Sequence, residues 1–165
     1  MFRSKLFTVL TVVLFVFGIA MIDCAVAGEK VKAYGTSVNT KWHQIEVGDE
    51  EGHVIAVSEN KVVYFNEKTG EKATQIFTAT WDFNTKTGQG TLKGYGVMTS
   101  SNGDKRFSTS EGKPVGKGHF KGTYTYTGGT GKFEGLKGGG TWDSKSLAPG
   151  ISYNEVEGER EIPGQ

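Results

Sequence analysis

The sequence has little cysteine and little proline, with one cysteine and three prolines in 165 residues. Cys24 lies before residues 28–165, which we expect to form the mature domain. That domain therefore has no disulfide bond and no thiol for catalysis or metal binding. Its stability must come from packing. Proline occurs only at Pro114, Pro149 and Pro163, while glycine is abundant and threonine, valine and aromatic residues fill the intervals. This composition disfavours helices along almost the whole chain.

The chain also lacks a large excess of charge of either sign. The formal net charge of the chain is +1, and residues 28–165 contain 17 basic and 17 acidic residues. Binding to nucleic acid or to an anionic membrane requires a basic face, so neither partner is expected.

The first 27 residues are expected to form a signal peptide. Arg3 and Lys5 precede an uncharged run at 6–22, and the small residues Ala25-Val26-Ala27 match a cleavage site. Cleavage would make Gly28 the first residue of a single domain that spans 28–165, secreted or periplasmic in a bacterium and without stable membrane association.

Two alternatives to cleavage remain open. The apolar run has 17 residues, whereas a membrane-spanning helix needs roughly 20, so an uncleaved anchor is the first alternative. A lipoprotein modified at Cys24 is the second, although Asp23 occupies the position where a small residue is expected.

Eight strands in sequence predict an all-β fold, a closed eight-stranded antiparallel barrel. Each strand is a run rich in β-branched or aromatic residues between glycine-rich turns. The expected strands are 40–47, 53–65, 73–83, 89–99, 104–111, 116–127, 132–143 and 151–161.

The connecting turns include an internal repeat. Residues 65–70 read Phe-Asn-Glu-Lys-Thr-Gly and residues 83–88 read Phe-Asn-Thr-Lys-Thr-Gly. In both copies Asn is expected to accept backbone hydrogen bonds and Gly to adopt a left-handed conformation. A third turn at 101–104 contains Asn102-Gly103, for which we expect positive φ at both residues.

Alternation predicts which residues face the interior. In 73–83 the inward set contains Phe77 and Trp81; in 116–127 it contains Phe120, Tyr124 and Tyr126, which leaves His119 facing solvent. Gly138, Gly140 and Trp142 form a small, small, large pattern expected to let the barrel curve and close. Strand 53–65 is apolar on both faces, which indicates either an oligomer surface or a bulge.

Two glycine-rich motifs support a family resemblance. Residues 94–105 read Gly-Tyr-Gly-Val-Met-Thr-Ser-Ser-Asn-Gly-Asp-Lys, and residues 126–142 contain Gly-Thr-Gly-Lys-Phe-Glu-Gly. Together they resemble the allene oxide cyclase barrel-like superfamily, including uncharacterised secreted bacterial members, and the second motif is also similar to dirigent proteins. The residues before about Gly70 carry no part of this resemblance. It implies an allene oxide cyclase-like (calycin-like) barrel with a hydrophobic pocket, and no catalytic residue of the plant cyclases can be placed on this chain.

The candidate ligand-binding residues are aromatic and lie on expected inward faces. They are Phe77, Trp81, Tyr95, Phe120, Tyr124 and Trp142. The alternative is that these side chains simply fill a small barrel.

Other site chemistries receive little support from the sequence. His43, His53 and His119 lack the close spacing of a metal site, so no metal or other cofactor is expected. No Gly-x-Ser-x-Gly elbow is present, and we expect the serines to lie mostly in turns.

Three functional hypotheses follow. The first is an exported barrel that binds a small apolar molecule in its interior. The second is a cyclase- or isomerase-like enzyme, which also requires a polar group beside the cavity; Tyr95, Tyr126 and Glu111 are candidates. The third is a homo-oligomeric interaction module that uses the outer face of 53–65.

Overall fold

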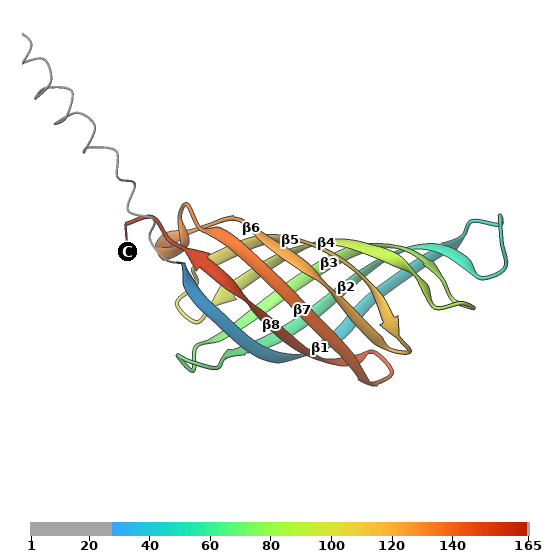
Figure 1. Cartoon of the computed structure of the whole chain (residues 1–165), viewed down its shortest axis with the longest axis horizontal. Coiled ribbons are helices and arrows are strands. Elements are labelled where there is room, and N and C mark those ends of the chain that lie inside the picture. Colours follow the sequence, from blue (N-terminus) through green and yellow to red (C-terminus); the bar gives the residue numbers. More distant parts are fainter. Residues whose placement is uncertain (1–27, 165) are drawn as a thin grey trace, which may run out of the picture.

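Eight antiparallel strands in chain order form a closed barrel, in which each strand pairs with the next and the last pairs with the first (Figure 1). The computed structural model describes residues 28–164, so the expected signal peptide lies outside the described residues. The strands are β1 (Glu29–Glu46), β2 (His53–Asn66), β3 (Lys72–Asn84), β4 (Gln89–Ser100), β5 (Lys105–Gly116), β6 (His119–Gly129), β7 (Lys137–Ala148) and β8 (Ile151–Glu161). A short 3-10 helix, η1 (Gly131–Phe133), precedes β7. The predicted all-β, eight-stranded antiparallel barrel is confirmed.

The starts of β1 and β7 differ most from the expected positions, and β5 ends five residues later than expected. β1 begins at Glu29, about ten residues earlier than expected, because its inward positions carry small residues such as Ala33, Gly35 and Ser37 that give a weak strand signal. β7 begins at Lys137, since the preceding residues form η1 and Gly135 turns the chain at a φ of 72°.

The two repeat turns form as predicted. The side-chain oxygen of Asn66 accepts hydrogen bonds from the backbone amides two and three residues later, at 3.0 and 2.8 Å. The side chain of Asn84 does the same at 2.9 and 3.0 Å. Gly70 and Gly88 have φ values of 68° and 71°, which are accessible to glycine at little cost.

The turn at 101–104 differs from the prediction. Gly103 has a φ of 90°, but Asn102 does not adopt a positive φ. The Asn102 side chain binds both the backbone amide of Asp104, at 3.1 Å, and its carboxylate, at 2.7 Å. The backbone amide of Ser100 donates to the carbonyl of Asp104, which makes a longer loop with a single glycine in the left-handed region.

The outer face of β2 keeps its apolar side chains exposed. Ile55, Val57, Val63 and Phe65 alternate with buried inward residues such as Val54. β2 pairs with β3 without a register shift, and the irregularity against β1 falls between Asn39 and Lys41. The bulge interpretation of 53–65 is therefore wrong, because the extra residue lies in β1.

Inward rings lie over glycines of neighbouring strands. The indole of Trp142 covers Gly112 and Gly122, and the ring of Phe77 covers Gly94. A Cβ atom at any of these glycines would collide with the ring above it. These contacts explain why glycines occur inside the strands, where they would otherwise weaken the sheet.

Two histidines on the outer surface of the barrel lie against carboxylates. His119 is half-buried, and its Nε2 lies 2.9 Å from the carboxylate of Asp143 on β7. At the start of β2, His53 Nδ1 lies 2.6 Å from Asp49 and Nε2 lies 3.0 Å from Asp82. His53 therefore ties the β1–β2 loop to β3.

The stability of the loop end of the β1–β2 hairpin is expected to depend on pH through His53. Hydrogen bonds to Asp49 and then to Asp82 raise the pKa of His53 above its ordinary value of 6.5. Because the folded-state pKa is raised, the stabilisation is fully present below pH 6.5 and is lost as the pH rises through the raised pKa. An NMR titration of the His53 ring should report a pKa above 6.5 that falls in Asp49→Asn, and a value at or below 6.5 in the unmodified protein would contradict the prediction.

Candidate functional site

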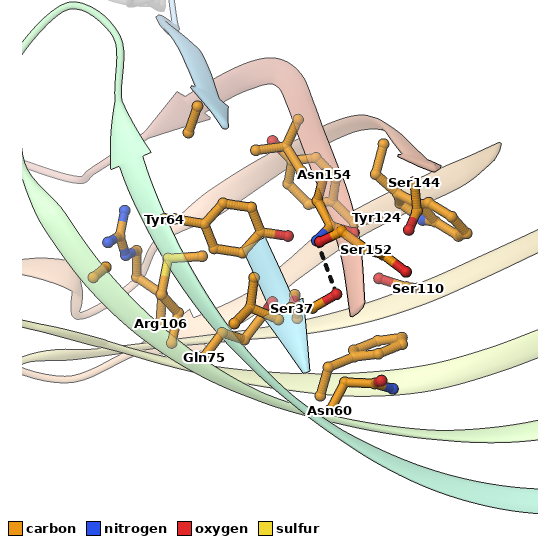
Figure 2. Close-up of a pocket in the computed structure, with 18 of the residues that line it drawn as sticks. Ser37, Asn60, Tyr64, Gln75, Arg106, Ser110, Tyr124, Ser144, Ser152 and Asn154 are labelled. Atoms are coloured by element: carbon orange, nitrogen blue, oxygen red, sulfur yellow. Dashed lines mark hydrogen bonds between the residues drawn. The ribbon is translucent and has the colours of Figure 1, made fainter. Parts of the chain in front are cut away.

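A cavity of about 190 Å³ occupies the barrel interior and is bordered by all eight strands. Engineered apolar cavities of about 150 Å³ accept a benzene molecule, so this space is large enough for a small ring-containing compound. The side chains therefore do not fill the barrel completely. Figure 2 shows that polar side chains from several strands point toward this space.

Five of the six predicted pocket residues line the cavity: Phe77, Trp81, Phe120, Tyr124 and Trp142. The expected inward position of Tyr95 is wrong, because its side chain is on the outer surface and is 71% exposed. On β4 the alternation places Gly94 and Gly96 inward, where the ring of Phe77 and the side chain of Gln75 occupy the space above them.

Aromatic rings gather at the end of the barrel that holds the β1–β2 and β3–β4 turns, and we call Trp42, Trp81 and Phe120 the aromatic end. The Trp81 ring lies 5.5 Å from that of Phe120 in an edge-on arrangement and 5.7 Å from that of Trp42. The Trp81 indole also donates a hydrogen bond of 2.8 Å to Ser58. These contacts fix the orientation of Trp81 at the cavity wall.

Trp42 was missed in the sequence because of the irregularity in β1. Up to Asn39 the odd-numbered residues of β1 face inward, and the extra residue at Thr40 reverses the alternation. Trp42 can therefore contact Trp81 on the inner side. A bulge of this kind has no distinct signal in a threonine-lysine step, so simple alternation fails there.

Polar side chains form the middle of the cavity wall, contrary to the expectation of a mainly aromatic lining. Asn154 donates a hydrogen bond of 3.0 Å to Ser37, drawn in Figure 2, and a second of 3.3 Å to the carbonyl of Ser152. Others in this region are Asn60, Gln75, Ser108, Ser110 and Ser144. These serines lie within strands rather than in turns, and this placement makes the interior amphipathic.

The opposite end of the barrel is closed by the segment that follows β6. Phe133 of η1 is 0% exposed and Leu136 is 2% exposed. The guanidinium carbons of Arg106 and Arg160 lie 4.6 and 5.7 Å from the Phe133 ring centre. We call these four residues the closed end. η1 lies near the C-terminus in Figure 1.

Arg106 is the buried cation that lines the cavity at the closed end. It is 6% exposed; its Nη2 donates a hydrogen bond of 3.3 Å to Ser100 and lies 4.0 Å from Glu71. Burial lowers the pKa of Arg106 despite the nearby carboxylate. Although burial opposes it, hydrogen bonding from Ser100 and the charges of Arg106 and Lys132 hold the pKa of Glu71 below its ordinary value.

Three tyrosines, Tyr64, Tyr124 and Tyr126, share the cavity wall with Arg106. Tyr64 and Tyr124 are buried, and burial raises the pKa of each hydroxyl above its ordinary value. Both hydroxyls therefore remain protonated and can donate hydrogen bonds at neutral pH. The Tyr124 and Tyr126 rings meet edge-on at 5.3 Å, and the Tyr124 hydroxyl has no hydrogen-bond partner within residues 28–164.

The three polar candidates for an enzyme fall in different places. Tyr126 lines the cavity. Tyr95 and Glu111 are on the outer surface, where Glu111 forms an ion pair of 3.0 Å with Lys93. Tyr126 is therefore the only one of the three in a position to contact a molecule in the cavity.

Within residues 28–164, no three histidine, cysteine, aspartate or glutamate side chains are grouped as metal ligands. Likewise, no helix in the described part of the chain is long and apolar enough to cross a membrane.

Comparison with solved structures places this barrel beside a dirigent protein described as a pterocarpan synthase. The TM-score is 0.50 at 12% sequence identity, over 81% of this chain and 88% of that protein. A pyocyanin demethylase also matches, with a TM-score of 0.45 at 14% identity, over 78% of this chain and 99% of the other. No family model matches the sequence, and no curated protein is significantly similar to it. At these identities the dirigent protein shows a shared barrel fold and nothing about substrate.

Proposed function

We propose that this protein binds a small organic molecule inside its barrel. The observation that carries the proposal is the cavity of about 190 Å³, with the aromatic end at one side and hydrogen-bonding groups along its wall. A few polar groups placed within a largely apolar concave surface are typical of small-molecule sites. Because serine, asparagine and tyrosine side chains line the space, we propose an amphipathic ligand in place of the purely apolar one expected from the sequence.

We also propose that the protein is an exported bacterial member of the allene oxide cyclase barrel-like superfamily. The barrel and the two glycine-rich motifs support the superfamily, and the charged start and apolar run of residues 1–27 support export. Mass spectrometry of the exported protein should give the mass of a chain that begins at Gly28. Retention of residues 1–27 would contradict cleavage.

A cyclase- or isomerase-like enzyme is the second candidate. Tyr126 and Tyr124 lie on the cavity wall beside the buried cation Arg106, which is the combination of pocket and polar group that this hypothesis requires. Such a site could orient a reactive molecule and donate a proton or hydrogen bond to it. Turnover of any molecule recovered from the purified protein would favour this candidate over simple binding.

Self-association through the outer face of β2 is the third candidate. Ile55, Val57, Val63 and Phe65 are exposed there, next to Tyr34, whose ring stacks on Phe65 at 6.2 Å. Native mass spectrometry of the purified protein would report a homo-oligomer directly. It would also detect a small molecule retained in the barrel.

Trp81 provides the test of cavity binding. The neutral probe 2-naphthamide should bind the unmodified protein in isothermal titration calorimetry, and Trp81→Ala should weaken its binding at least about tenfold because the aromatic wall is lost. The free energy of unfolding should fall by about 2 kcal/mol, less than for a core aromatic, since the ring borders an existing cavity.

The matched control is Tyr95→Ala, which removes an exposed ring from the outer surface. It should leave both probe affinity and stability nearly unchanged. Equal loss of affinity in the two variants, or no binding of the probe to the unmodified protein, would count against a site inside the barrel.

A further inference from the structure

We propose that the closed end of the cavity binds an acidic group of the ligand, so that the ligand is a small aromatic acid with its ring toward the aromatic end. This inference rests on the proposed function, since it names the chemical class of the molecule in the same cavity. The acidic group would be a carboxylate or an ionised phenol.

The first observation is that the closed end presents hydrogen-bond donors. The cavity wall there carries Arg106 and the hydroxyls of Tyr64, Tyr124 and Tyr126. In Figure 2 the Tyr64 hydroxyl points toward the side of the cavity where Ser37 and Asn154 lie. A guanidinium cannot accept a hydrogen bond, and tyrosine hydroxyls that stay protonated can donate one, so this wall suits an acceptor.

The second observation is that two of the three buried donors without a partner in residues 28–164 belong to side chains that border the cavity. Nε of Arg106 and the hydroxyl of Tyr124 form no hydrogen bond with any described residue. Both side chains are more than nine-tenths buried and border the cavity. A buried polar atom without a partner is costly, so such atoms in a cavity wall indicate a missing acceptor.

The third observation is the incomplete compensation of the charge on Arg106. Within the cavity wall its carboxylate neighbour is Glu71, at 4.0 Å from Nη2. Glu71 lies closer to Lys132 Nζ, at 3.4 Å, and accepts a hydrogen bond of 2.9 Å from Ser100. One carboxylate is thus shared by two cations, which leaves the region beside the cavity positive. An anion in a site of low dielectric gains most from such a charge.

Arg160 shows what a purely structural arginine looks like in the same place. It is also buried and also packs against the Phe133 ring. Its Nη1 also lacks a partner, but its Nε forms a close ion pair of 2.8 Å with Glu29, and Arg160 does not border the cavity. Packing against η1 therefore accounts for Arg160 but leaves the weaker pairing of Arg106 and its position on the cavity wall unexplained.

The test compares two probes of nearly the same shape, 2-naphthoate and the neutral 2-naphthamide, by calorimetry at pH 7.5. The unmodified protein should bind the carboxylate at least about tenfold more tightly, the usual size of a charge-assisted hydrogen bond. Arg106→Met should remove this preference and leave the affinity for 2-naphthamide within about threefold of its original value. Arg160→Met, the matched control, should keep the preference.

The outcomes separate the two proposals. Equal affinity for both probes in the unmodified protein, or an unchanged preference in Arg106→Met, would overturn the acid site while leaving the barrel as a binding site. Absence of binding for both probes would overturn the proposed function itself. Should Arg106→Met not fold, Tyr64→Phe removes only a hydroxyl and should reduce the preference at least about threefold; an unchanged preference there would overturn the acid site.

Discussion

Replacing Phe133 with alanine is expected to lower the free energy of unfolding by about 4 kcal/mol, the typical cost for a fully buried phenylalanine. Its side chain is 0% exposed and closes one end of the barrel. Removal of the ring would leave a cavity. The buried guanidinium groups of Arg106 and Arg160 would also lose the ring that packs against them. Urea unfolding followed by circular dichroism measures the loss.

The control for this change is Phe65→Ala on the outer face of β2. Phe65 is 37% exposed and contacts Tyr34 by stacking, so its loss should cost no more than about 1 kcal/mol. If the two variants unfold within about 1 kcal/mol of each other, η1 does not close the barrel in the way described.

Gly122→Ala is expected to destabilise the barrel by about 3 kcal/mol. A Cβ at Gly122 would collide with the backbone carbonyl of Glu111 and with the indole of Trp142. The carbonyl belongs to a paired strand and cannot move without disturbing the β5–β6 ladder, and the indole is held by a hydrogen bond of 3.1 Å to the carbonyl of Thr123. Both neighbours therefore resist the added methyl group.

Gly116→Ala is the matched substitution in an open position. The nearest atom to a new Cβ there is the Cβ of His119 at 3.8 Å, an ordinary contact distance. Its effect on the free energy of unfolding should stay within about 1 kcal/mol. A loss of similar size at both glycines would mean that conformational freedom, and not the close approach of the Trp142 ring, explains the glycine at 122.

The repeat turns and the inward faces of β3 and β6 were predictable because each depends on local rules. Asn66 and Asn84 bind amides two and three residues away, and the strand period of two places Phe77 and Tyr124 on one side of their strands. The position of Tyr95 was not predictable in the same way, because a strand that alternates glycine with larger residues has no clear apolar face.

The sequence by itself determined an eight-stranded antiparallel barrel and five of the six predicted aromatic residues in its wall. Only the tertiary structure decided the rest of the site: the bulge that turns Trp42 inward, the serines inside strands, and the packing of Arg106 against Phe133 at the closed end. The physical reason is the distance along the sequence over which each effect acts. Alternation and turn chemistry act between residues a few positions apart, whereas Arg106 meets Glu71 and Phe133, which are distant in the sequence and come together only when the strands pair into the barrel.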